Sequence, residues 1–306
     1  MTAAEPETQY AVPRGRRTGE RPLLWRVGRG LTTFARRSPL SAFWGCIAAA
    51  IIVTAVAAPV LAPYEPLKSD FRAMSKPPSE RHYFGTDQIG RDTLSRVIYG
   101  SRTSLTVAIG AVLFGTTLGA LWGLASGYFG GRFDIVSQRI IEFLQSFPDL
   151  ILAMAIAMAL GAGIGTVIVA IAITRIPFGG RVIRALVLSL KEISYVEAAR
   201  GLGASHLRIM LRHILPQCVA PYLILATTHL GVAIIIEAAL GFLGVGVPPP
   251  TPTWGNMLAD SLNAGLVPPW WLVLFPGLAI TLTVLAFNLL GDGIRDVLDP
   301  RLRGAV

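Results

Sequence analysis

Residue types that could do chemistry are thinly spread along this 306-residue chain. The four histidines and two cysteines fall in different segments, without the spacing of metal ligands. No G-x-x-x-x-G-K-[ST] stretch occurs to cradle nucleotide phosphates, and there is no H-E-x-x-H, nucleophile elbow or pair of catalytic carboxylates. We therefore predict no metal, no cofactor and no catalytic residue in this chain.

Glu237 stands out because it directly follows the apolar run Ile234–Ile236. An ionisable group at membrane depth is by default a functional candidate. The alternative is a structural ion pair near the outer end of its helix, with Arg96 or Arg102 as partner. Glu142 and Asp149 are the other acids set in an apolar stretch.

The composition describes a chain whose solvent is lipid. Apolar residues make up 53% and charged residues only 15%, with a mean hydropathy of +0.58, whereas soluble domains carry about 25% charged residues. The net charge of +9 is interpreted as the cytoplasmic bias of membrane proteins. Because no basic stripe alternates with exposed aromatics, we predict no nucleic-acid partner.

Six segments are long and apolar enough to cross a bilayer, which takes about 20 residues. They are Leu40–Ala62, Leu105–Tyr128, Ile140–Leu160, Thr166–Leu188, Val219–Leu243 and Trp271–Leu290. Pro148 and Pro177 are each expected to kink or locally open a span. Basic residues, Arg175 among them, gather in the segments that face the cytoplasm if both termini lie inside. The sequence therefore predicts an all-α membrane protein with six transmembrane helices.

These spans divide the chain into five parts. They are a partly disordered cytoplasmic tail (1–39), a first span (40–62), an extracytoplasmic segment with an amphipathic helix (63–104), a core of five spans (105–291) and a cytoplasmic tail (292–306).

A charged segment at 192–216 interrupts the core. Ser194-x-x-Glu197 has the form of a capping box, which predicts a helix beginning near Tyr195. Ala198 and Ala199 continue that helix with little bulk, and Gly203 is expected to make a bend.

A second short helix should follow the bend. Leu207, Met210, Leu211 and Ile214 would share one face of it, and Pro216 would open the next span. Two small helices that meet at a glycine could form a projection that docks into a groove of another protein. The alternative, an amphipathic hairpin that lies on the membrane, stays open.

The extracytoplasmic segment predicts an amphipathic helix from Thr86 to Gly100. Its acids precede bases by four residues, in the pairs Asp87–Arg91 and Asp92–Arg96. The alternative is a solvated face of self-paired charges.

A stiff loop, Val247–Pro252, would place Trp254 at the outer interface. It could present a surface to a substrate-delivery protein or cap the bundle.

Several of these stretches resemble one known family. Glu197-Ala198-Ala199, then Gly203, then Leu215-Pro216 are similar to the EAA signature of ATP-binding-cassette (ABC) importer permeases, although His213 replaces the usual isoleucine. Three further stretches, "HYFGTDQIGRDTLSRVIYGSRTSL", "EAALGFLGVGVPPPTPTWGNML" and "LLGDGIRDVLDPRL", resemble the C-type permease subunit of dipeptide, oligopeptide and nickel importers. Together the matches cover nearly the whole chain from about residue 37.

The resemblance implies a type I importer transmembrane domain in a bacterial inner membrane, with both termini cytoplasmic. It also implies a second homologous permease subunit, two ATPase subunits carrying ATP and magnesium, and an extracytoplasmic substrate-binding protein. The implied coupling residues are Glu197, Ala198, Ala199, Arg200, Gly203, Leu215 and Pro216, and the extracytoplasmic or pathway candidates are Asp87, Arg91, Asp92, Glu237 and Trp254. The second candidate function is an ATP-independent secondary transporter or channel.

Overall fold

The computed structural model describes residues 34–35, 38–263 and 267–298. Most of the tail predicted to be partly disordered (1–39) and the end of the last family-like stretch lie outside these residues. The described part is helical, with one isolated bridge between Thr86 and Asp92 and no strand.

The helices are long and apolar, as the hydropathy predicts. In chain order they are α2 (Pro39–Val56), α3 (Ala58–Leu61), η1 (Phe71–Ala73), α4 (Thr93–Phe129), α5 (Gly131–Gln145), α6 (Asp149–Leu160), α7 (Ile164–Leu190), α8 (Ser194–Gly201), α9 (His206–Ile209), η2 (Met210–Ile214), α10 (Leu215–Phe242), α11 (Trp254–Leu262) and α12 (Trp270–Leu298). Among the described residues, 5 helices are long and apolar enough to cross a membrane, or up to 6 if one bent pair counts as a span.

The bent pair corrects the third predicted span. Residues 140–160 do not form one helix, because α5 and α6 meet at 90° across a short break. Pro148 directly precedes α6, and it has no N–H to continue the ladder of α5 and disfavours helical backbone at Phe147. Pro177, by contrast, is accommodated inside α7.

The helix predicted from Thr86 to Gly100 is also different in the structure. The helix α4 begins after Asp92 and continues without interruption to Phe129, so Gly100 does not end it. A Cβ at Gly100 would lie 3.1 Å from the indole Cδ1 of Trp254. Gly100 therefore makes room for Trp254 rather than terminating a helix.

The pairing of α4 with α7 rests on a ridge of glycines. Gly115, Gly119, Gly123 and Gly127 recur every four residues, and side chains at these positions would collide with the backbone or Val187 of α7. Backbones approach closely where small residues follow a small-x-x-x-small pattern in membrane helices. This pattern is visible in the sequence and explains why α4 and α7 lie against each other.

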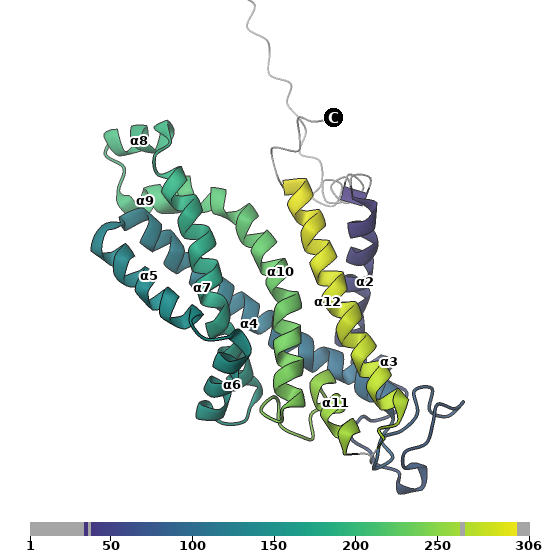
Figure 1. Ribbon diagram of the computed structural model, residues 1–306. Coiled ribbons are helices and arrows are strands. Elements are labelled where there is room, and N and C mark those ends of the chain that lie inside the picture. Colours follow the sequence, from purple (N-terminus) through teal and green to yellow (C-terminus); the bar gives the residue numbers. More distant parts are fainter. Residues whose placement is uncertain (1–33, 36–37, 264–266, 299–306) are drawn as a thin grey trace, which may run out of the picture.

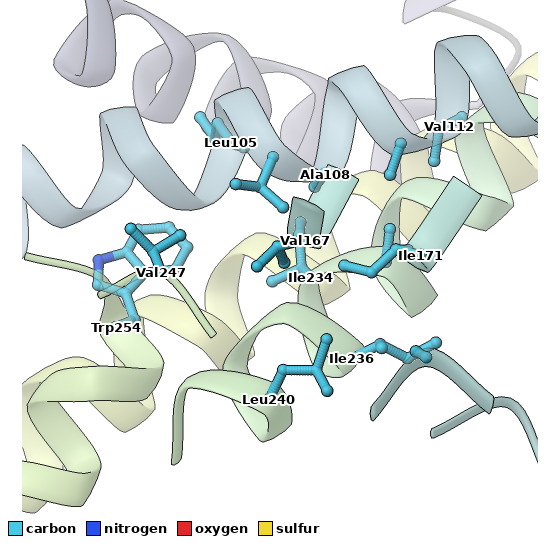
Figure 2. Packing of buried hydrophobic residues seen from close by; sticks show 14 of the residues in the cluster. Leu105, Ala108, Val112, Val167, Ile171, Ile234, Ile236, Leu240, Val247 and Trp254 are labelled. Atoms are coloured by element: carbon cyan, nitrogen blue, oxygen red, sulfur yellow. The ribbon is translucent and has the colours of Figure 1, made fainter. Parts of the chain in front are cut away.

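The main core lies where α4, α7 and α10 meet (Figure 2). Leu105 and Val112 of α4 pack with Ile171 of α7 and Ile234 of α10, all buried. Figure 1 shows α8 and α9 projecting at one end of the bundle, called here the hairpin end, and α11 with the segment after α3 at the other, called the loop end.

Candidate functional site

The α8–α9 hairpin, residues 192–216, links α7 to α10 and lies at the hairpin end of the bundle, where α8 projects beyond the other helices (Figure 1). Its bend is a Schellman motif: the Ala204 N–H donates to the Ala199 carbonyl at 3.0 Å and the Gly203 N–H donates to the Arg200 carbonyl at 3.0 Å. Gly203 has φ of 79°, a left-handed conformation that favours glycine. The predicted bend at Gly203 is present.

The predicted capping box is wrong. The N-cap of α8 is Ile193, and no side chain caps this helix. The helix begins one residue earlier than expected, so Ser194 already has helical backbone and Glu197 is exposed at the surface. Burial of Val196, whose side chain is 0% exposed, fixes this register by tertiary packing.

The predicted apolar face of the second short helix is confirmed only in part. Ile214 is buried and Met210 half-buried as predicted, but Leu207 and Leu211 are exposed, and the buried Ile209 was not part of the predicted face. The five residues Met210–Ile214 form a π-helical turn, which shifts the angular position of the following side chains relative to an α-helix. The buried set is therefore spaced by five residues.

A second core fastens the hairpin to the spans. Val196, Ile209 and Ile214 pack in one cluster with residues of α4 and α7, namely Leu124, Tyr128, Ile183, Val187 and Leu190. The Tyr128 hydroxyl lies 2.9 Å from His206 Nδ1, and Lys191 Nζ donates to the Gly127 carbonyl at 3.2 Å. Movement of the hairpin is thereby tied to movement of α4 and α7.

The outward surface of the hairpin carries most of the residues that the sequence singled out. Glu197, Ala198, Arg200, Gly203 and Pro216 are exposed, and Ala199 and Leu215 are half-buried. At the bend, Leu202 is 89% exposed. An exposed leucine on a rigidly anchored projection is suited to burial in another protein.

At the loop end, charged side chains form a buried network. Asp87 accepts from Arg91 Nε at 2.6 Å and from Arg96 Nη1 at 2.5 Å. Both arginines also contact Asp260 of α11, at 3.4 Å and 3.1 Å. The predicted Asp87–Arg91 pair is present, but in a turn before α4 rather than on a helix, and it ties this turn to α11.

Asp92 does not pair with Arg96 as predicted. Its carboxylate caps α4, accepting from the Ser95 N–H at 2.8 Å and the Ser95 hydroxyl at 2.7 Å. It also lies 2.9 Å from His82 Nδ1. An Asp at the N-cap satisfies an otherwise unpaired backbone donor, and this use of the side chain turns Asp92 away from Arg96.

Trp254 is buried, so the prediction that it faces the outer interface is wrong. Its side chain is 2% exposed, and its indole N–H donates to the Val97 carbonyl at 3.0 Å. The helix α11 folds back against α4 and carries the indole inward, into the space left by Gly100.

Glu237 is 1% exposed and has no arginine partner among the described residues. The predicted pairing with Arg96 or Arg102 is therefore wrong. Both carboxyl oxygens of Glu237 are buried without a hydrogen-bond partner among the described residues.

An ion pair that the sequence analysis did not predict lies halfway along the bundle. Arg175, expected in a cytoplasmic segment, is 2% exposed in the middle of α7 and pairs with Asp149 at the start of α6. The sequence did contain a signal for this ion pair, because it places a charged residue near the centre of a span and an acid at a proline break. Among the described residues, no group of three or more His, Cys, Asp or Glu could hold a metal.

The fold and these features define a multi-pass membrane protein with a projecting hairpin and a polar break at mid-depth. The profile of one family, described as "Binding-protein-dependent transport system inner membrane component", matches residues 98–304. The chain belongs to this family and is the transmembrane permease subunit of an ABC importer, as the sequence predicted.

The sequences of two relatives align with most of this chain. A dipeptide transport system permease protein of Alkalihalophilus pseudofirmus is 42% identical over 261 residues, covering 84% of this chain and 84% of the relative. A glutathione transport system permease protein of Escherichia coli O1:K1 is 43% identical over 255 residues, covering 83% and 84%. The inward-facing MetNI methionine ABC transporter shares the fold, with a TM-score of 0.56 at 20% identity over 67% of this chain and 98% of that chain.

Proposed function

We propose that this chain carries small peptides across the membrane as half of a translocation pathway. The relatives named for dipeptide and glutathione transport support a peptide substrate, because glutathione is itself a small peptide. Family membership favours this importer over the ATP-independent alternative.

The single observation that carries the mechanism is the anchored α8–α9 hairpin. It offers exposed Ala198, Gly203 and Leu202 to a partner, while buried Val196 and Ile209 fix it to α4 and α7. An ATPase subunit that grips the exposed surface therefore pulls on two membrane helices at once. In this proposal the hairpin end faces the cytoplasm, and both termini lie on that side.

The sequence has no phosphate-binding loop, so in this proposal the ATP that drives an importer of this family acts on partner subunits. Two partner ATPase subunits bind ATP together with magnesium and hydrolyse the ATP. A second homologous permease completes the pathway, and a binding protein delivers the peptide to the loop end. The residues proposed to mediate coupling remain Glu197, Ala198, Ala199, Arg200, Gly203, Leu215 and Pro216. At the loop end, Asp87 and Arg91 hold the turn that joins α11.

The test is to purify the tagged chain from its native membrane in mild detergent and identify the proteins that accompany it. We expect P-loop ATPases and a second permease. The purified assembly is then placed in liposomes. It should move labelled dipeptide across the membrane only when ATP is on the side of the ATPase subunits and the binding protein is on the opposite side. A chain that purifies alone and still moves dipeptide without ATP would contradict the proposal.

A further inference from the structure

An open surface cavity of about 450 Å³, with a mixed polar and apolar lining, lies beside the break between α5 and α6. It is lined by Glu142, Gln145, Ser146, Asp149, Phe178 and Arg181. The break lies between a helix that starts near the hairpin end and one that leads toward the loop end, so the cavity is at mid-depth in the bundle (Figure 1). In secondary transporters, discontinuous helices near the bilayer midplane form the substrate sites.

The charges around the cavity differ in how they are held. Arg175 has a side chain that is 3% exposed, whereas the side chain of its partner Asp149 is 35% exposed. Arg175 is further fixed because its Nε donates to the Thr174 hydroxyl at 3.1 Å and its guanidinium lies 5.0 Å from the Phe178 ring centre. Asp149 is therefore the member of the pair that reaches the cavity, with a fixed cation behind it.

Two other groups on the lining have unused hydrogen-bonding capacity. Arg181 is exposed and makes no ion pair with any described residue. The Oε1 atom of Gln145 is buried without a hydrogen-bond donor.

We propose that this cavity receives the two charged ends of a small zwitterionic peptide during its passage. The ammonium group donates hydrogen bonds to the Asp149 carboxylate, and Arg181 donates to the terminal carboxylate. This inference rests on the proposed function, because it takes a peptide as the substrate.

The test uses the complete transporter in liposomes, with binding protein saturated by one of two labelled dipeptides. One has a free carboxylate and the other is its C-terminal amide. Uptake per ATP hydrolysed is compared for wild type, Arg181→Gln and the control Arg132→Gln, in which an exposed arginine of α5 away from the cavity is changed.

We expect Arg181→Gln to lower uptake per ATP of the free-carboxylate peptide by roughly tenfold, the loss of one charged hydrogen bond. Uptake of the amide per ATP should be the same for Arg181→Gln as for wild type. For Arg132→Gln, uptake per ATP of both peptides should be the same as for wild type. Equal uptake of both peptides by wild type and Arg181→Gln would overturn the proposal. A loss that is the same for both peptides would overturn it as well, because it would show a general structural defect.

Asp149→Asn gives the matching test at the other end of the peptide, with N-acetylated dipeptide as the comparison. The expected loss is confined to the peptide with a free ammonium group, and a loss shared by the N-acetylated peptide would overturn the assignment of Asp149. If this variant fails to assemble because Arg175 loses its partner, Arg181→Gln decides alone. A wild-type transporter that hydrolyses ATP but takes up neither free nor blocked peptide would overturn the proposed function itself, whereas wild-type uptake with unaffected variants overturns only this site.

Discussion

Arg184 of α7 forms a bidentate ion pair with Asp134 of α5: Nε lies 2.6 Å from Oδ1 and Nη2 lies 2.5 Å from Oδ2. The Ser126 hydroxyl of α4 donates to the same carboxylate at 2.5 Å. Three helices thus meet at one acid near the hairpin end. Bidentate arginine–carboxylate pairs fix the relative orientation of the two side chains as well as stabilising their contact. This pair therefore fixes the position of α5 relative to α7.

We predict that Arg184→Gln lowers the free energy of unfolding by about 1.5–3 kcal/mol, the range for hydrogen bonds to charged groups. The matched control is Arg139→Gln, because Arg139 pairs with Glu142 at 2.8 Å but both side chains are largely exposed. An exposed pair contributes at most about 1 kcal/mol. Denaturant titration in detergent measures both variants, and equal effects would contradict the structural role of Arg184.

A second prediction concerns the contact of α4 with α7. Gly119→Ala should destabilise the protein by about 1–3 kcal/mol, as overpacking does, because the added Cβ would collide with the Ile176 carbonyl. Gly165→Ala in α7 should be neutral or slightly stabilising, since nothing lies within 4 Å of that position and alanine favours helix. Thermal unfolding of the two variants is the measurement, and tolerance of Gly119→Ala would exclude the close approach.

The third prediction addresses the bend of the hairpin. Gly203→Ala should strain the bend by about 1–2 kcal/mol, the cost of left-handed backbone for a residue with a Cβ. Nothing else among the described residues opposes the side chain, because no atom beyond the chain neighbours of Gly203 lies within 4 Å of the added Cβ. The chain should reach the membrane normally but hydrolyse ATP with less uptake, and Gly203→Leu should show the same uncoupling.

Gly201→Ala is the matched control for Gly203. Gly201 is also exposed with nothing within 4 Å, but its φ is not positive. Uptake per ATP by this variant should equal that of wild type. If both alanine variants lose coupling to the same extent, bulk rather than backbone conformation is responsible.

The fourth prediction separates the two acids of the loop-end network. Asp87→Ala should cost about 3–5 kcal/mol, as removal of one member of a buried pair does, because the side chain of Arg96 is 4% exposed. Asp260→Ala should cost about 1 kcal/mol, since the Asp260 side chain is 43% exposed and Asp87 still faces both arginines. Thermal unfolding distinguishes them, and a larger loss for Asp260→Ala would reverse the assigned importance.

The helical spans were predictable because crossing lipid requires about 20 apolar residues whatever the neighbours are. Hydropathy therefore located α2, α7, α10 and α12, and most of the predicted helix ends lie within a few residues of the observed ones. The main exception is α12, which extends to Leu298. The bend at Gly203 was predictable for a similar local reason, since glycine tolerates left-handed backbone. The ridge from Gly115 to Gly127 was present in the sequence and was missed, although its spacing of four is the signal.

Local sequence determined the membrane class, most of the spans, the bend of the hairpin and the family resemblance that the comparisons confirm. The tertiary structure alone decided which charges meet. Asp92 caps its own helix instead of binding Arg96, and Arg175 finds Asp149 across a proline break. It also decided that Trp254 turns inward and that Ile209 and Ile214 form the buried face. The reason is physical: apolar runs and glycines act through the backbone beside them, whereas side-chain partners depend on helices that are distant in sequence and are brought together by packing.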